Sequence, residues 1–466
     1  MACNAQKDVF MKNQFTKKKT IRILAVTIPA MILGVLLILY GLSQSGFLGD
    51  RLIPADSELT QHTDSIEAMQ GSEEVPDLPE ISSEPEPEPE PYIPVEYDIH
   101  LMAVGDNLMH MGVVNAGKQE DGTYNYDFLY EGLAPFLEKA DIRIVNQETI
   151  LGGNASGFSG YPHFNSPTQV GDALVKAGFN VILHASNHAA DMSIEGLLNC
   201  VDYWETQPEV LMVGINKEGT ADDEEREIPL FTVEDVTFAI LNYTYGPNME
   251  VIPSNIRGYL NILCDWDRSS GLLNFTKLNP QVIEDIERAD ELADVVIVCP
   301  HWGTEYMTTP SGYQQDWAMQ MTLAGADLII GTHPHVVQPV EFLTAENGNT
   351  SLCYYSLGNY VSTQKQPICM FEAMAWVTFH YHEEEGVSLR LEDSGALPLV
   401  CHYTSGPVRA KAVYPLEDYT TELADAHGIL NYGGKALHLE DLQQWNLEIL
   451  GDYAMKAEEL LEDSDD

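Results

Sequence analysis

The chain is short of basic residues. Lys and Arg number 23 against 72 Asp and Glu, which gives a formal net charge of −49 at pH 7. A surface this acidic repels phosphate backbones, so nucleic acid is excluded as an expected partner. An anionic substrate would need a local cation, and a bound metal ion is the simplest source of one.

Two further patterns are missing. No GxxxxGK[ST] phosphate loop is present, so we do not expect this chain by itself to be an ATP-driven polymerising ligase. The seven cysteines show no CxxC pair and no regular spacing. Several of them lie in apolar runs such as 296–299, which predicts small buried side chains rather than a disulfide framework.

Only one apolar run is long enough to span a bilayer. Residues 23–42 carry no charge, and residues 1–22 before them hold six basic residues against Asp8 alone. A helix of about 20 residues crosses a hydrocarbon core of about 30 Å, and the basic side stays in the cytoplasm. We expect a retained single-pass anchor, a cytoplasmic basic tail at 1–22 and an extracellular main domain in the cell membrane. A cleaved signal peptide, the alternative, usually has a shorter apolar stretch of about 7–15 residues.

Residues 43–96 form an acidic linker rich in Pro and Glu. Its repeat of alternating Glu and Pro at 84–91 removes every second backbone N–H, so it cannot pair in a sheet. An extended, disordered spacer that holds the next domain away from the membrane is expected.

From residue 97 the pattern changes to an α/β domain, expected over 97–408, followed by an acidic C-terminal extension at 409–466. Short apolar runs predict strands and amphipathic runs between them predict helices. The predicted strands are 99–104, 142–145, 181–183, 210–213, 295–298 and 328–330, with antiparallel strands at 371–381 and 387–391. The predicted helices are 129–139, 169–177, 281–292 and 314–324, with one or two more in 437–461.

Polar segments follow five of these predicted strands, where open α/β sheets place their ligands. Each segment alone is weak, because an Asp after a strand is often a helix cap. Five together, rich in His, carboxylate and amide groups, form the ligand set of two-metal hydrolytic sites. The segments are Gly105–His110, Asn146–Glu148, His184–Asp191, Cys299–Tyr306 and Gly331–His335.

Taken together, these segments resemble a known family. GDxxxH, NxE, NHxxD, HWGxEY, GxHPHVxQ and YSLGN occur in this order between about Ile99 and Val400. The set is similar to the CapA family of capsule-synthesis or poly-γ-glutamate-biosynthesis proteins, whose domain is related to calcineurin-like metallophosphatases. The resemblance implies a four-layer α/β/β/α sandwich holding one or two divalent transition-metal ions, such as manganese, zinc or iron.

The resemblance also implies roles for individual residues. Asp106 and His335 would bind the first ion and Glu148 would bridge, while Asn187, His301 and His333 would bind the second. His188 would act as the catalytic proton donor, with Asp191 orienting it.

This sequence departs from the metallophosphatase pattern at three places. The bridging ligand would be Glu148 within NxE rather than the Asp of a GDxxD motif, a change shared with CapA proteins. The DxH pattern is absent because Leu108 stands two residues after Asp106, so the first ion lacks a ligand unless His110 supplies one. Ser193 stands where Gly is expected, which we interpret as a helix cap. Further candidates for the metal or its surroundings are Asn146 and Asn359, and His163 and Asn165 for substrate binding. Arg143 is a further basic group available to an anionic substrate.

Three functions fit this sequence. The favoured one is a membrane-anchored extracellular protein of capsule or poly-γ-glutamate biosynthesis, a dinuclear-metal hydrolase or transferase on an anionic cell-envelope polymer, working with other capsule-synthesis subunits. The alternatives are a metallophosphoesterase for small molecules and a non-catalytic, polymer-binding assembly subunit. Metal content paired with turnover separates them.

Overall fold

The computed structural model describes residues 92–461 apart from residues 93, 220–225 and 405–412. The predicted tail at 1–22, the membrane span at 23–42 and nearly all of the linker at 43–96 lie outside the described residues. Among the helices that are described, none combines the length and apolar character needed to cross a membrane. The fold below is that of the compact unit starting at Glu96.

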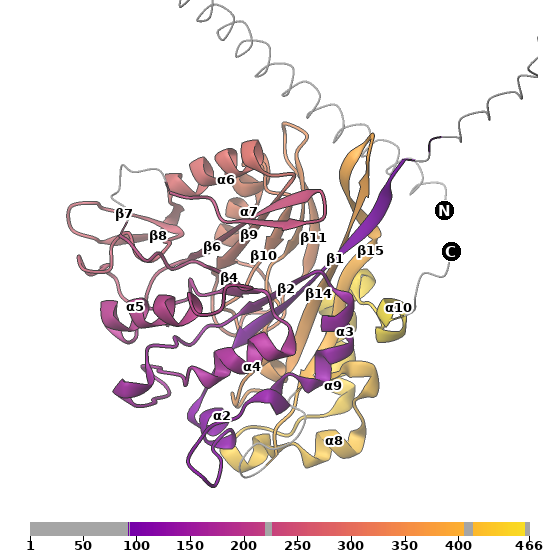
Figure 1. Ribbon diagram of the computed structural model, residues 1–466. Helices are drawn as coiled ribbons and strands as arrows, with labels where there is room; N and C mark the ends of the chain where they lie inside the picture. Colours follow the sequence, from indigo (N-terminus) through magenta and orange to yellow (C-terminus); the bar gives the residue numbers. More distant parts are fainter. Residues whose placement is uncertain (1–91, 93, 220–225, 405–412, 462–466) are drawn as a thin grey trace, which may run out of the picture. The chain divides into compact units, whose positions relative to one another are not determined.

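The larger of two main sheets has eight strands in the order β16-β15-β14-β1-β2-β3-β4, with β13 also paired to β1 (Figure 1). β1, β2, β3 and β4 run parallel, so their carboxyl ends meet at one edge, whereas β14, β15 and β16 are antiparallel. The strands are β1 (Glu96–Asn107), β2 (Ile142–Asn146), β3 (Val181–Leu183), β4 (Leu211–Val213), β13 (Asn359–Val361), β14 (Phe371–His382), β15 (Gly386–Cys401) and β16 (Val413–Pro415).

The second sheet has six strands in the order β11-β12-β10-β9-β6-β5, in which β6, β9, β10 and β12 are parallel. A separate two-stranded sheet joins β7 to β8. These strands are β5 (Leu230–Val233), β6 (Val236–Thr244), β7 (Cys264–Trp266), β8 (Leu273–Leu278), β9 (Val295–His301), β10 (Leu328–Ile330), β11 (Val340–Thr344) and β12 (Thr350–Tyr354).

The two main sheets pack face to face. Alternate residues of both sheets, such as Leu101, Ile144 and Ile297, fall in one buried apolar cluster, and the rings of Phe238 and Phe379 lie 5.4 Å apart across it. The other face of each sheet packs against helices: α3, α4 and α5 on the larger sheet and α6 and α7 on the smaller one (Figure 1). The predicted α/β fold is therefore confirmed, as two facing sheets with helices on the outer face of each.

The helices are short, and α3, α4, α6 and α7 end at the residues that the sequence predicts. α6 begins at Pro280 after the Asn279 cap, and a capping box of Ser311 with Gln314 starts α7. The α-helices are α2 (Met111–Ala116), α3 (Ala134–Lys139), α4 (Gln169–Ala177), α5 (Ser193–Trp204), α6 (Pro280–Leu292), α7 (Gly312–Ala324), α8 (Thr421–Ala426), α9 (Leu439–Trp445) and α10 (Ala457–Leu461).

Two details correct or refine the sequence analysis, and a third agrees with it. The helix predicted at 129–139 is split, because two 3-10 turns precede α3 and Pro135 occupies its first turn. The segment after residue 412 is packed into the fold: β16 pairs with β15, and Leu442 and Leu450 are buried in the core between the sheets. The six described cysteines are buried and free of disulfides, as expected.

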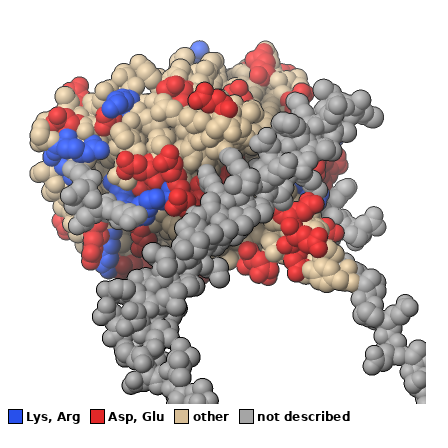
Figure 2. Space-filling view, turned by 90° about the horizontal axis from the view of Figure 1, so that it is seen from above, with Lys and Arg blue, Asp and Glu red and all other residues tan. Residues whose placement is uncertain are grey.

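Acidic side chains dominate the charge on the described surface as they do in the sequence. On the face shown in Figure 2, Asp and Glu side chains are spread widely, and Lys and Arg side chains lie in a few separate groups.

Candidate metal centre

The six predicted metal ligands meet at the carboxyl ends of the parallel strands of both sheets. Asp106 lies near the end of β1 and His301 ends β9, while the other four lie on the loops that follow β2, β3 and β10. All six side chains are buried. Two sheets that face each other thus supply one site, as strand-end placement predicts.

Asp106, Glu148 and His335 form the first half of the site, called here the carboxylate half. His335 Nδ1 lies 3.0 Å from Asp106 Oδ2 and 3.8 Å from Glu148 Oε2. One donor atom from each residue lies within 4.8 Å of the other two, which is close enough for a single ion. The Ser186 hydroxyl donates to the backbone carbonyl of Glu148 at 2.6 Å and fixes the loop that carries it.

Asn187, His301 and His333 form the second half, called here the imidazole half. His301 Nε2 lies 2.9 Å from Asn187 Oδ1 and 4.0 Å from Glu148 Oε1, so Glu148 reaches both halves. The rings of His301 and His333 are 4.9 Å apart. His333 and His335 have φ values of 97° and 59°, a costly conformation that lets two histidines two positions apart face different halves.

Several buried polar atoms at this site have no hydrogen-bond partner within the described part of the chain. They are both carboxylate oxygens of Glu148, Nδ1 of His333 and Oδ1 of Asn146. An unpaired buried carboxylate is expensive, and a buried polar atom without a partner calls for a missing ion or water. Carboxylate, imidazole and amide donors suit a divalent transition metal, so the residues present fit such an ion.

The two halves differ in protonation. Burial lowers the pKa of His301 and His333 well below the ordinary value, so both imidazoles are neutral and ready to coordinate. Burial also raises the pKa of Glu148. His335 is the exception: burial alone would lower its pKa, but the charges of Glu148 and Asp106 outweigh burial and raise it to about 9.

His188 and Asp191 form a pair beside the imidazole half. His188 Nδ1 lies 2.8 Å from Asp191 Oδ2, which also accepts a 2.7 Å hydrogen bond from the backbone N–H of Phe164. The Phe164 ring contacts His188, with centroids 4.6 Å apart. Asp191 thus holds one ring nitrogen of His188 and leaves Nε2 for another partner.

The predicted substrate segment divides into an exposed and a buried residue. The side chain of His163 is 75% exposed, and its Nδ1 lies 3.8 Å from Asp191 Oδ1. Asn165 is buried, and its side-chain amide bonds the backbone of Gly152, Gly153 and Gly157 at 2.6–3.0 Å. Asn165 therefore shapes the 152–157 loop.

His110, Asn146 and Asn359 surround the ligands. Asn146 Nδ2 donates to Asp106 Oδ1 at 2.7 Å and lies 3.4 Å from His301 Nδ1, so it touches both halves. Asn359 Nδ2 donates to the backbone carbonyl of His335 at 3.3 Å rather than to a ligand ring. Burial, with His335 and His188 nearby, lowers the pKa of His110 to about 4.

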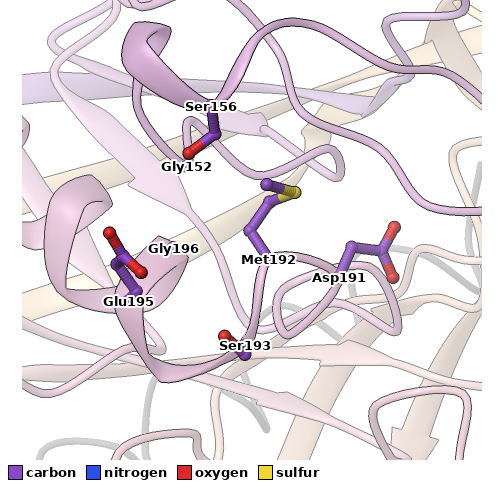
Figure 3. A pocket seen from close by; sticks show the side chains of 7 residues that line it. All are labelled: Gly152, Ser156, Asp191, Met192, Ser193, Glu195 and Gly196. Carbon is purple, nitrogen blue, oxygen red and sulfur yellow. The ribbon is translucent and has the colours of Figure 1, made fainter.

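A pocket of about 300 Å³ borders Asp191 (Figure 3). It is lined by Gly152, Ser156, Asp191, Met192, Ser193, Glu195 and Gly196. Ser193 is not the expected cap, because Met192 holds the cap position of α5 and Ser193 is its first residue. The φ of 56° at Ser193 is the left-handed conformation that explains the expectation of Gly. Arg143 lies near the start of β2, where its guanidinium donates to the Leu137 carbonyl, away from the carboxyl end where the ligands gather.

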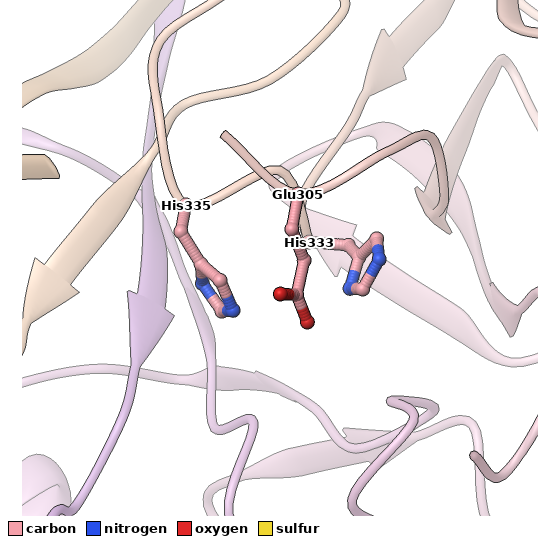
Figure 4. A group of neighbouring side chains, drawn as sticks. All are labelled: Glu305, His333 and His335. Atoms are coloured by element: carbon pink, nitrogen blue, oxygen red, sulfur yellow. The ribbon is translucent and has the colours of Figure 1, made fainter. Parts of the chain in front are cut away.

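Sequence reasoning did not assign four residues that the structure places at the site. Glu305 offers a carboxylate within 4.8 Å of donor atoms of His333 and His335 (Figure 4). Thr332 Oγ1 lies 2.9 Å from His301 Nδ1. Tyr245 and Asn248 support the imidazole half: the Tyr245 ring lies 4.7 Å from that of His333, and Asn248 accepts from Asn187 at 3.2 Å. The HWGTEY segment was a signal for Glu305, whereas Tyr245 and Asn248 follow β6, a strand that the sequence patterns did not predict.

Known proteins are similar to this chain over the region that contains the metal centre. Residues 100–364 match the family model described as bacterial capsule synthesis protein PGA_cap. The chain is similar to the PGA biosynthesis protein CapA of Bacillus subtilis (strain 168), at 30% identity over 264 residues, 56% of this chain and 62% of that protein. It is also similar to the capsule biosynthesis protein CapA of Bacillus anthracis, at 27% identity over 271 residues, 56% of this chain and 59% of that protein. The match therefore spans about six tenths of the length of these relatives.

Two solved structures are similar at low sequence identity. A hypothetical protein from Thermus thermophilus gives a TM-score of 0.35 at 13% identity, covering 64% of this chain and 99% of that one. The NAD nucleotidase of Haemophilus influenzae gives a TM-score of 0.36 at 10% identity, covering 76% of this chain and 60% of that one.

Proposed function

Because this chain belongs to the bacterial capsule synthesis family PGA_cap, we propose that it is a metal-dependent hydrolase or transferase that acts on a cell-envelope polymer during capsule or poly-γ-glutamate biosynthesis. One observation carries the chemical part of this proposal. Six potential ligands from five strand ends meet in a buried cluster, and several of their carboxylate and imidazole atoms have no hydrogen-bond partner among the described residues.

In this proposal Asp106, Glu148 and His335 hold one ion and Glu148, Asn187, His301 and His333 hold the other. Bound ions would polarise the scissile carbonyl or phosphoryl group and lower the pKa of an attacking water. His188 would donate a proton to the leaving group from Nε2, while Asp191 keeps the ring in the required orientation through Nδ1. His163, which is exposed, would meet the substrate outside this pair.

The acidic chain sets a condition on the substrate. A protein with a net charge of −49 repels a polyanion such as poly-γ-glutamate. Attraction must then come from the bound ions and from protonated histidines. Turnover of such a polymer is expected to depend on salt and divalent ions.

We place the catalytic domain outside the cell, anchored by residues 23–42 with the basic tail at 1–22 in the cytoplasm. The uncharged run and its basic flank support this topology. Without a phosphate loop the chain would trim, transfer or anchor a polymer made by another capsule-synthesis subunit. Protease added to intact cells should cut the chain after residue 50; protection of the domain together with cleavage of the N-terminus would overturn the topology.

The chemical proposal is tested on the purified full-length chain. Metal content is measured together with turnover of p-nitrophenyl phosphate and of γ-glutamyl peptides. Metal with turnover of γ-glutamyl peptides supports the polymer hydrolase, and turnover of the phosphoester alone would point to a small-molecule phosphoesterase. Metal without turnover of either, combined with normal polymer release by a His188→Ala strain, would leave a non-catalytic assembly subunit.

A further inference from the structure

Glu305 lies at the open side of the site on the loop between β9 and α7. It is exposed, unlike the six buried ligands. Figure 4 shows its carboxylate between the imidazoles of His333 and His335. One donor atom from each of the three lies within 4.8 Å of the other two.

The fold holds Glu305 at this place. The loop that carries it is tied to the loop after β10 on both sides of Glu305. The Trp302 N–H donates to the Thr332 carbonyl at 3.1 Å, and the Tyr306 N–H donates to the Pro334 carbonyl at 2.8 Å. A third bond, from Gln338 Nε2 to the Met307 carbonyl at 2.8 Å, closes the connection. The backbone at Glu305 cannot leave the two histidines without breaking these bonds.

Proximity of an exposed acid to two histidines does not by itself identify a ligand, but His333 provides an independent observation. His333 is 4% exposed, and its Nδ1 has no hydrogen-bond partner within the described part of the chain. If Glu305 only formed a surface contact with this ring, its carboxylate would be the natural acceptor for that nitrogen. A cation between them satisfies both groups.

The carboxylate half also has room for another donor. Its own residues, Asp106, Glu148 and His335, provide three ligands, and Leu108 offers none. Two divalent ions would bring four positive charges against the two carboxylates of the buried site. A third carboxylate reduces the excess, and carboxylate oxygen suits ions such as manganese.

We propose that Glu305 is a seventh protein ligand of the metal centre, which binds from the solvent side next to His333 and His335. The inference rests on the metal centre proposed above. Because Glu305 is exposed and lies on the open side, it is the ligand that a substrate group would meet first and displace most easily.

The test is metal binding by the full-length chain, stripped with chelator and titrated with Mn²⁺. Glu305→Gln keeps the shape of the side chain and removes its charge, and Glu346→Gln is the control at an exposed glutamate on the turn between β11 and β12. We expect Glu305→Gln to weaken the binding of at least one Mn²⁺ by about 10- to 100-fold, the range seen when support of a metal site is removed. Glu346→Gln should bind like the parent, and Glu305→Asp should weaken binding less than Glu305→Gln.

Cobalt provides a second readout that a structural role would not change. The visible absorption of the Co²⁺-loaded protein reports the number and kind of its ligands, so it should differ between Glu305→Gln and Glu346→Gln. Asp106→Asn is the reference for the centre itself. If Glu305→Gln matches the parent in affinity and spectrum while Asp106→Asn loses metal, the inference about Glu305 is wrong and the centre stands. If neither variant changes metal binding, the proposed centre fails as well.

Discussion

The two halves of the metal centre are built from different chemistry. The carboxylate half holds two acids and a histidine, His335, whose pKa they raise to about 9. The imidazole half holds an amide and two histidines whose pKa values burial lowers, so both imidazoles are neutral. Without metal, the first half is kept together by a proton on His335, and the second is a set of neutral donors. Proton release and ion binding are therefore coupled mainly in the carboxylate half.

The largest expected effect comes from removing one ligand from each half. Asp106→Asn should lose the ion of the carboxylate half and His333→Ala the ion of the imidazole half. Because a catalytic ion contributes several kcal/mol to the transition state, either change should lower turnover on the order of 10⁴-fold. Metal equivalents per chain are measured by elemental analysis. If each variant loses all of its metal, the two ions bind as one unit and the distinction between the two halves is wrong.

Removal of the proton donor should separate chemistry from metal binding. His188→Ala leaves all six ligands in place and is expected to keep its metal content. Turnover should fall by about 10²–10⁴-fold, the usual contribution of a general acid. Turnover should fall less in Asp191→Asn, because the proton donor His188 remains although a carboxylate no longer holds its ring. Metal loss in His188→Ala would show instead that this histidine belongs to the imidazole half.

The carboxylate half should make the metal-free protein sensitive to pH. His335 binds its proton more tightly in the folded chain, with a pKa of about 9 against an ordinary 6.5. Its contribution to the free energy of unfolding is therefore complete below about pH 6.5 and is lost as pH rises through about 9, at most about 3 kcal/mol. The pKa of Glu148 is also raised in the folded chain. This carboxyl therefore likewise makes the free energy of unfolding fall as pH rises above the ordinary pKa of a glutamate.

Urea unfolding of the metal-free chain at pH 6, 7.5 and 9 measures this loss. His335→Gln should flatten the decline, and saturating metal should remove it because the ion replaces the proton. A metal-free protein that becomes more stable between pH 6.5 and 9 would contradict the proton assigned to His335.

Many of the strands and helices could be predicted from the sequence, because the patterns that indicate them are local. The runs at 181–183 and 328–330 form β3 and β10 with the predicted bounds, and 169–177 is α4. These elements are short, apolar and bounded by turns, which is where pattern reasoning works best. The meeting of the polar segments at one place followed because the carboxyl ends of parallel strands lie at one edge of a sheet.

The rest depends on tertiary contacts that no local pattern contains. Strand β6 was missed, and with it Tyr245 and Asn248, which support the imidazole half. The short strand β16 forms only as an edge on β15, so its sequence resembles a loop. Ser193 takes a left-handed φ that normally favours Gly, and the residue type alone suggested a cap.

The smallest expected effect tests the residue that joins the two halves. Asn146 donates to Asp106 Oδ1 at 2.7 Å and lies 3.4 Å from His301 Nδ1, whereas the Thr332 hydroxyl lies 2.9 Å from His301 Nδ1. Asn146→Ser should therefore lower the binding affinity of both ions by about tenfold each. Thr332→Val should lower the affinity of only the ion in the imidazole half, by a similar factor. Titration of each metal-free variant with Mn²⁺ gives the two affinities separately. Equal losses at both ions in Thr332→Val would mean that the halves communicate through Glu148, the ligand that reaches both, rather than through Asn146.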